Sequence, residues 1–358
     1  MKVGIVGLPN AGKSTLFNAL TRGGAETGDY PFTTIDPNVA VVGVPDERLE
    51  AVAETVGSSE VVLETIEFHD IAGLVRGASE GEGLGNRFLA AIRETDAICH
   101  VVRTHDASAV PHPEGRVDPR DDIELIELEL LASDLDQAQR RLERVTKQAR
   151  SLDKELLAER AWLERVVAAL EDGRPVREVP VPPDAPEAPR LLQALTSKPI
   201  LYVANVDEGS DIVPEGVAEH ARGAKAQAVA ISARIESELA EIDDPAEAAE
   251  LRGEMGVSES GLTRVIRTAF ELLDLITFFT AGEDREAMAR NVGRGSTAWE
   301  SAAKIHGDIQ KAFVRAEVVG WRDLVEAGGY AGARDRGKLR LEGRDYVMAD
   351  GDVMTVKV

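Results

Sequence analysis

The chain has 358 residues, and its apolar content of 43% is ample for hydrophobic cores in two or three domains. No apolar run approaches the roughly 18 residues of a membrane span, and the N-terminal apolar segment is too short for a signal peptide. The net charge of -23 disfavours nucleic-acid binding except through a local basic patch. A single cysteine, Cys99, excludes an internal disulfide framework, so we expect a cytoplasmic protein without a membrane partner.

The first predicted element is a strand over residues 2–6 that leads into a phosphate-binding loop, GLPNAGKST, at residues 7–15. This loop satisfies G-x-x-x-x-G-K-[ST], in which glycines let backbone N–H groups wrap a phosphate and the next helix adds its dipole. Lys13 is expected to reach the β- and γ-phosphates during catalysis, and Ser14 to bind Mg²⁺. The nucleotide-binding residues predicted in this loop are Asn10, Ala11, Gly12, Lys13, Ser14 and Thr15.

Two segments that follow are candidates for the rest of the magnesium site. Thr34 precedes a predicted strand at residues 39–44 and could supply a second hydroxyl ligand, although adjacent threonines are also common in strands. Asp70 ends the next apolar alternation and begins Asp-x-x-Gly, so its carboxylate could hold a metal-bound water while Gly73 senses the γ-phosphate. The glycine-rich segment after Gly73 is typical of a mobile loop.

Three more predicted strands, at residues 97–102, 199–203 and 227–231, complete a doubly wound α/β sheet with its ligand at the strand C-termini. The second of these strands leads into Asn205-Val206-Asp207-Glu208, and the third into Ser232. A cluster of turn residues ordinarily just ends a strand. The alternative is that Asn205, Val206, Glu208 and Ser232 bind the base of a nucleotide.

Between these strands, residues 121–171 predict an antiparallel helical hairpin. Apolar residues three and four apart form a coiled-coil seam, and a proline-rich segment leads back to the sheet. Plain packing between the two helices is the first interpretation, and docking of a partner is the alternative. The seam residues are Leu128, Leu131, Leu135, Ala138, Leu142, Val145, Ala149 and Leu152 in the first helix, and Leu156, Leu163, Val166 and Leu170 in the second.

The C-terminal part predicts a small β-grasp-like α+β module, with strands within 275–280, 311–319 and 352–358 around a helix at 297–307. Arg334, Arg336, Lys338 and Arg340 recur at period two, which would place four cations on one strand face. This basic run is the candidate contact with RNA. The alternative is a charged edge strand that resists aggregation.

Taken in order, GLPNAGKST, PFTTIDPN, FHDIAGLVRGASEGEGLGNRFL and NVDE resemble the YchF family of Obg-like ATPases, a translation-factor group of P-loop NTPases. The resemblance spans essentially the whole chain. It implies a G domain over residues 1–119 and 198–275, a coiled-coil insertion over 120–197 and a TGS domain over 276–358. It further implies Mg²⁺-dependent nucleotide hydrolysis by a monomer that associates with ribosomes, through ribosomal RNA or ribosomal proteins.

The resemblance also gives the tetrad at residues 205–208 a meaning. Guanine-binding relatives use Asn-Lys-x-Asp, whose aspartate accepts two hydrogen bonds from the guanine edge. Here Val206 replaces the lysine and Glu208 the aspartate, and losing a matched bidentate pair costs several kcal/mol of discrimination. ATP is therefore predicted over GTP. A GTP-preferring enzyme, or a nucleotide-clamped ribosome-binding factor with little turnover, are the alternatives.

Hydrolysis is expected to be slow, because Leu74 stands where many GTPases carry a glutamine that orients the attacking water. The resemblance offers His112 as a catalytic residue, although a histidine between two prolines is also typical of a solvated loop. By the same analogy, Asn10 is a candidate ligand for K⁺.

Overall fold

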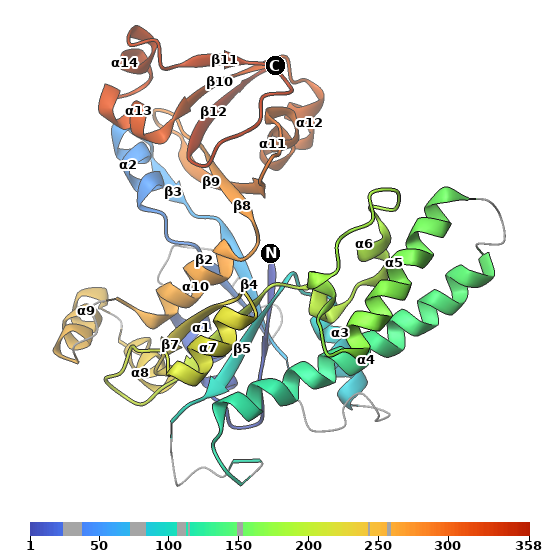
Figure 1. Ribbon diagram of the computed structural model, residues 1–358. Helices are drawn as coiled ribbons and strands as arrows, with labels where there is room; N and C mark the ends of the chain where they lie inside the picture. The colour runs from blue at the N-terminus through green and yellow to red at the C-terminus, as the bar shows by residue number, and fades with distance from the viewer. Residues whose placement is uncertain are drawn as a thin grey trace. The chain divides into compact units, whose positions relative to one another are not determined.

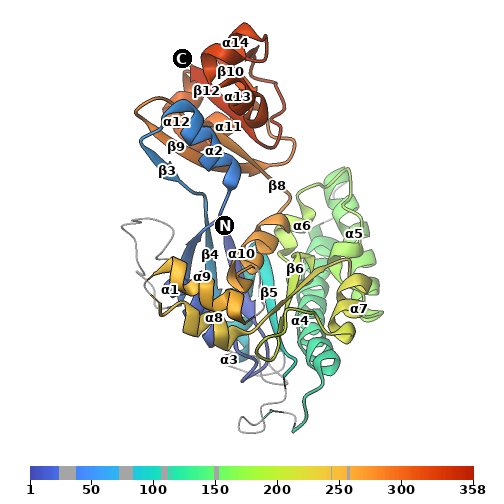
Figure 2. The same ribbon diagram turned by 90° about the vertical axis from the view of Figure 1, so that its left-hand side faces the viewer.

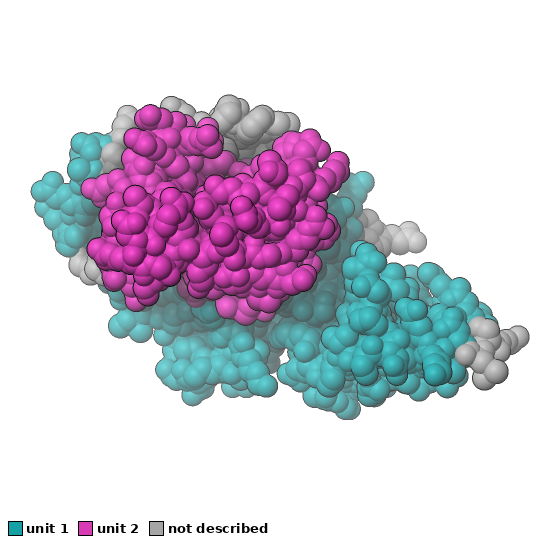
Figure 3. Space-filling view, turned by 90° about the horizontal axis from the view of Figure 1, so that it is seen from above, with its two compact units in different colours: residues 1–23, 34–40, 67–269 teal, residues 24–33, 41–66, 270–358 magenta. Residues whose placement is uncertain are grey.

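The computed structural model describes residues 1–23, 38–71, 84–105, 112–113, 115–148, 153–242, 244–255 and 259–358. The predictions for Thr34, Gly73 and Leu74, and those for the seam residues Ala149 and Leu152, fall outside these residues. The chain divides into two compact units, residues 1–23, 34–40 and 67–269 and residues 24–33, 41–66 and 270–358, which are coloured separately in Figure 3. Within the described ranges, no helix combines the length and the apolar character that a membrane span requires.

The first sheet carries the phosphate-binding loop. Its strand order is β2-β4-β1-β5-β6-β7, and the pairs from β4 through β7 are parallel. The central strands β5 and β6 are buried along their whole length, as expected for strands with both faces covered. The strands are β1 Lys2–Val6, β2 Val39–Gly43, β4 Thr65–Asp70, β5 Ala97–Arg103, β6 Ile200–Asn205 and β7 Gln227–Ile231. The predicted doubly wound sheet is confirmed.

Helices cover both faces of this sheet (Figure 2). One face packs against α3, α4 and α7 around a single apolar cluster, and α1 packs on α8 beside the other. The helices of this part are α1 Lys13–Gly23, α3 Leu84–Arg93, α7 Glu215–Gly223, α8 Ala233–Leu239, α9 Pro245–Glu254 and α10 Gly261–Glu271.

The helical insertion begins with α4 Pro119–Gln148 and continues with α5 Lys154–Glu171, which lie side by side (Figure 1). Trp162, Leu163 and Val166 of α5 are buried against the second half of α4. The short elements η2 Val176–Glu178, α6 Ala188–Leu192 and η3 Leu195–Ser197 then lead back to the sheet.

The predicted seam is wrong at its first residue, because Leu128 is 66% exposed. The first half of α4 instead turns Ile123, Ile126 and Leu130 toward the sheet. Only the second half of α4, from Leu131 onward, packs in the hairpin. Helix α4 thus contributes to two hydrophobic cores, and the sequence pattern does not separate the residues of one core from those of the other.

The second sheet has the order β11-β10-β12-β8-β9-β3 and mixes parallel with antiparallel pairs. Three of its six strands match predicted ones, β11 overlaps the predicted basic strand only at Arg340, and β9 and β3 were not predicted. Its strands are β3 Glu60–Val62, β8 Leu275–Thr280, β9 Glu286–Gly293, β10 Arg315–Gly320, β11 Arg340–Glu342 and β12 Asp352–Lys357. Its helices are α2 Glu47–Val56, α11 Ala298–Ile305, α12 Gly307–Lys311, α13 Trp321–Ala327 and α14 Tyr330–Asp335.

Residues 41–66 differ from the predicted domain ranges, which place them in the nucleotide-binding domain. The structure groups them with the C-terminal residues instead. Two contacts explain this grouping: β3 pairs with β9, and Leu49 and Val52 of α2 are buried beside Phe279 of β8. Neither contact has a signal in the local sequence, since each joins segments more than two hundred residues apart.

The predicted basic strand face is wrong. Arg334 lies in α14, Arg336 and Lys338 follow that helix, and only Arg340 is in a strand. A helix and a turn do not keep the period of two on which the prediction depended. Three of the four also pair with carboxylates, namely Arg334 with Glu317, Lys338 with Asp323 and Arg340 with Glu342.

Candidate nucleotide site

The phosphate-binding loop joins β1 to α1. The ammonium of Lys13 donates a hydrogen bond to the carbonyl oxygen of Leu8 at 2.9 Å, and the Ala11 N–H donates to the same oxygen at 3.3 Å. Lys13 is only 7% exposed. Burial lowers its pKa, and the negative charge of Asp70 opposes that shift. A buried cation beside the N-terminus of a helix is suited to an anionic ligand such as a phosphate.

Two glycines in the loop are required by its geometry. Gly7 has a φ of 154°, and a Cβ added there would lie 2.4 Å from the carbonyl oxygen of Val101. Gly12 has a φ of 102°, and its Cβ would lie 2.3 Å from Nδ2 of Asn205. Both positions therefore exclude a side chain on conformational and on steric grounds. Asn10 also has a positive φ, which asparagine tolerates better than most residues.

Ser14 and Asp70 lie close together beside the loop. The parallel register pairs Ile5 of β1 with Asp70 at the end of β4. This brings Oγ of Ser14 to 3.4 Å from Oδ2 of Asp70. A hydroxyl and a carboxylate fit Mg²⁺, which prefers oxygen ligands and takes few of them from the protein when phosphates and waters supply the others.

Asn205 connects three loops of the site. Its side chain is buried, and Nδ2 donates to the carbonyl oxygen of Ala11 at 3.0 Å. Its Oδ1 accepts from the Ala233 N–H at 3.1 Å, and Thr104 donates to its backbone oxygen through both N–H and hydroxyl. The predicted residue Asn205 thus ties the phosphate-binding loop to the ends of β5 and β7.

The other residues predicted to bind the base lie around Asn205. Val206 donates its N–H to the Ile231 oxygen at 3.0 Å, and its side chain is buried in the apolar cluster beneath the sheet. Ser232 is the residue before α8. Glu208 is exposed, and its Oε1 lies 3.1 Å from Nη1 of Arg234.

The sequence analysis missed Arg234 and His105 as members of this site. Arg234 follows Ala233 at the start of α8 and approaches Glu208. His105 follows β5, and its Nε2 lies 3.4 Å from Nδ2 of Asn205. Both follow predicted strands at the C-terminal edge of the sheet, and that position was the available signal.

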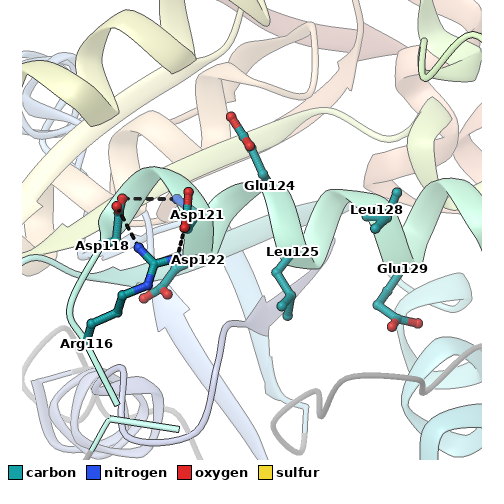
Figure 4. Close-up of a pocket in the computed structure, with 8 residues that line it drawn as sticks. All are labelled: Arg116, Asp118, Asp121, Asp122, Glu124, Leu125, Leu128 and Glu129. Carbon is teal, nitrogen blue, oxygen red and sulfur yellow. Dashed lines mark hydrogen bonds and ion pairs between the residues drawn. The ribbon is translucent and has the colours of Figure 1, made fainter. Parts of the chain in front are cut away.

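His112 is not a solvated loop residue, since its side chain is 4% exposed and its Nε2 lies 2.9 Å from Oδ2 of Asp122. Burial raises the pKa of Asp122, while the hydrogen bond with His112 lowers it. Asp122 also lines an acidic cavity of about 350 Å³ at the first turn of α4. Figure 4 shows Arg116 pointing toward Asp118 and Asp121 at the rim of this cavity. The contact with Asp122 holds His112 against α4.

A second polar cluster lies where α4 and α7 cover the sheet. Glu127 of α4 accepts a hydrogen bond from the hydroxyl of Tyr202, and its Oε1 lies 3.1 Å from Nε2 of His220. Burial raises the pKa of Glu127, but the hydrogen bonds from His220 and Tyr202 outweigh it and leave that pKa lowered. His100 of β5 lies beside Tyr202, with ring centroids 5.7 Å apart. Glu127 and His220 also line a cavity of about 380 Å³.

A P-loop nucleotide hydrolase is defined by three features of this unit: the sheet order, the loop at the end of β1, and the position of Lys13 at the N-terminus of α1. Comparison with known families agrees. Residues 2–149 match the family MMR_HSR1, described as "50S ribosome-binding GTPase". Residues 275–358 match the family YchF-GTPase_C, described as "Protein of unknown function (DUF933)".

Full-length relatives define the family. The chain is 47% identical to the ribosome-binding ATPase YchF of Bacillus subtilis, with 99% of this chain and 98% of that protein covered. It is 49% identical to the ribosome-binding ATPase YchF of Haemophilus influenzae over the same shares. The solved YchF GTPase of Schizosaccharomyces pombe matches with a TM-score of 0.88 and 35% identity, over 100% of this chain and 97% of that one. The chain belongs to the YchF family.

Proposed function

We propose that this chain is a Mg²⁺-dependent ATPase that prefers ATP to GTP and acts at the ribosome in the cytoplasm. The observation that carries the nucleotide preference is Glu208 in the tetrad that begins with Asn205. Asn205 is bonded to Ala11, so the tetrad belongs to the same site as the phosphate-binding loop. A glutamate carboxylate stands one methylene farther from the backbone than aspartate and does not reproduce the bidentate contact with guanine.

The catalytic residues proposed are those of the loop and of β4. Lys13 would bind the terminal phosphates, and Mg²⁺ would be held by Ser14 and by Asp70 through water, with Thr34 as a further ligand. The metal supplies neutralisation of the charge that develops on the transferred phosphoryl group. A K⁺ ion near Asn10 and a role for His112 in hydrolysis are kept as proposals. For His112 that role requires release from Asp122, which is consistent with slow intrinsic turnover.

The names of the relatives support ribosome association and leave one alternative. The curated bacterial relatives are named ribosome-binding ATPases, whereas the Schizosaccharomyces pombe relative is titled a GTPase. A GTP-preferring enzyme is therefore the second candidate. Arg334, Lys338 and Arg340 each pair with a carboxylate, which disfavours these cations as the contact with RNA. Ribosomal proteins are therefore the alternative contact on the ribosome.

Titration with fluorescent adenine and guanine nucleotides in Mg²⁺ tests the proposal. We expect the affinity for ADP to exceed that for GDP by at least about tenfold, since losing a hydrogen-bonding match to a charged carboxylate costs about 1.5–3 kcal/mol. Lys13→Ala should abolish binding of both nucleotides. Repeating the titration with ribosomes should raise the affinity for ATP if nucleotide and ribosome binding are coupled. Tighter binding of GDP than of ADP would favour the second candidate.

A further inference from the structure

Arg234 and Glu238 form an exposed ion pair on α8, and Arg234 also lies beside Glu208 of the tetrad at residues 205–208. Nε of Arg234 donates to Oε1 of Glu238 at 2.9 Å, one helical turn away. Nη1 of the same guanidinium lies 3.1 Å from Oε1 of Glu208. A guanidinium is a planar fork, so binding one carboxylate through Nε leaves the other nitrogens directed at a second. Glu238 therefore orients Arg234 toward Glu208.

The backbone brings these residues together independently of the ion pair. The bond from the Ala233 N–H to Oδ1 of Asn205 fixes the start of α8 beside the tetrad. Arg234 is the next residue, and Glu208 is three residues after Asn205. The buried hydrogen bond thus holds the start of α8 close to the tetrad, and the exposed ion pair sets the direction of the Glu208 carboxylate.

We propose that Arg234 is a specificity-determining residue that holds the Glu208 carboxylate away from a guanine edge. This inference rests on the proposed preference for ATP. The extra methylene displaces the Glu208 carboxylate from the position that an aspartate carboxylate would take, but glutamate also has rotamers that turn its carboxylate toward a base, so a contact that holds the rotamer adds to the barrier against guanine. A free carboxylate would accept hydrogen bonds from the guanine N1–H and 2-amino groups. With Arg234 in place, an approaching guanine must first break an ion pair, whereas adenine offers no N1–H to replace it.

The magnitude of the effect follows from the exposure of the pair. Both side chains are more than half exposed, so their interaction is screened by solvent and by salt. We expect Arg234→Ala to lower the ratio of the GDP to the ADP dissociation constant by about threefold to fivefold, mostly through tighter binding of GDP. Arg234→Lys should be intermediate, since a lysine provides the charge without the fork. In the wild-type chain the ratio should fall as salt rises, and in Arg234→Ala it should not.

The experiment is a double-mutant cycle read by nucleotide titration. Arg234→Ala should change the ratio in the wild-type chain and leave it unchanged in Glu208→Gln, because the guanidinium acts only through that carboxylate. Arg222→Ala is the matched control, since Arg222 forms an exposed pair with Glu215 on α7. An unchanged ratio in Arg234→Ala, or the same change in both backgrounds, would overturn the inference while the wild-type preference for ADP stands. A wild-type chain without that preference overturns the proposed function and this inference together.

Discussion

The phosphate-binding loop and the first half of α4 contribute to one core, but different kinds of contact fix them. In the loop, the backbone conformation is decisive: Gly7 and Gly12 have positive φ values, and the Ala11 N–H donates to the Leu8 carbonyl oxygen. Along α4, side chains far apart in sequence meet, as Glu127 of its first half does with Tyr202 and Asp134 of its second half with Thr196. A local sequence motif therefore specifies the loop, whereas the position of α4 depends on contacts between residues that are far apart in the sequence.

Because the two regions are held by different contacts, we expect substitutions in the loop to affect nucleotide binding and substitutions in α4 to affect stability. Leu8 of the loop and Ile126 of α4 share one apolar cluster, so the two regions are packed together. A change in the loop should remove nucleotide binding while the fold remains. A change in the contacts that hold α4 should lower the free energy of unfolding, with nucleotide binding nearly retained in the folded protein. Two substitutions test this separation and a third tests a buried histidine behind the site, and the expected effects decrease from the first to the third.

The largest effect is expected for Gly12→Ala. The added Cβ would lie 2.3 Å from Nδ2 of Asn205 at a φ of 102°, so the loop must move or the bond from Asn205 to Ala11 must break. Because the conformational strain and the steric overlap act together, we expect the upper end of the usual range for such strain, about 3 kcal/mol, which corresponds to roughly a hundredfold loss of ATP affinity. Isothermal titration calorimetry measures it. Gly216→Ala is the control, because nothing lies within 4 Å of a Cβ at that helical position. Wild-type affinity in Gly12→Ala would mean that the loop does not need this conformation.

The second effect concerns Asp134, which fixes α4 to the segment before β6. Its carboxylate accepts the N–H groups of Leu195 and Thr196 at 2.8 and 2.7 Å and the Thr196 hydroxyl at 2.8 Å. Asp134→Ala leaves buried donors without an acceptor, so the free energy of unfolding should fall by about 2 kcal/mol. Urea denaturation measures this change, with ATP affinity nearly retained in the folded protein. Asp136→Ala, which removes an exposed pair with Arg140 on the same helix, should cost less than about 0.5 kcal/mol.

The same contrast explains what the sequence could predict. Strand β1, the loop and Asp70 follow from apolar patterning and one motif, and the structure brings Ser14 and Asp70 together as expected. The error at Leu128 arose because period 3.5 does not reveal which neighbour each turn of a long helix meets. Arg234 was missed because its importance depends on Glu208, twenty-six residues earlier along the chain.

The smallest effect is a pH dependence from His100, which lies in β5 behind the site and is 1% exposed. Burial lowers the pKa of His100 to about 4, with the charges of His220 and Lys13 acting in the same direction and that of Glu127 against it. The unfolded chain, where this pKa is near 6.5, binds the proton more tightly than the folded one. Stability from neutral His100 is therefore present above pH 6.5 and is lost as the pH falls toward 4.

Between pH 7 and pH 5.5 this linkage should remove about 1 kcal/mol from the free energy of unfolding. His100→Leu should remove that part of the pH dependence, because leucine does not titrate. His306→Gln is the control, since His306 is exposed and lies in the C-terminal unit, so the wild-type slope should persist. Urea denaturation at both pH values gives the comparison. An equal slope in His100→Leu and in the wild-type chain would assign the pH dependence to other groups and would contradict the role given to His100.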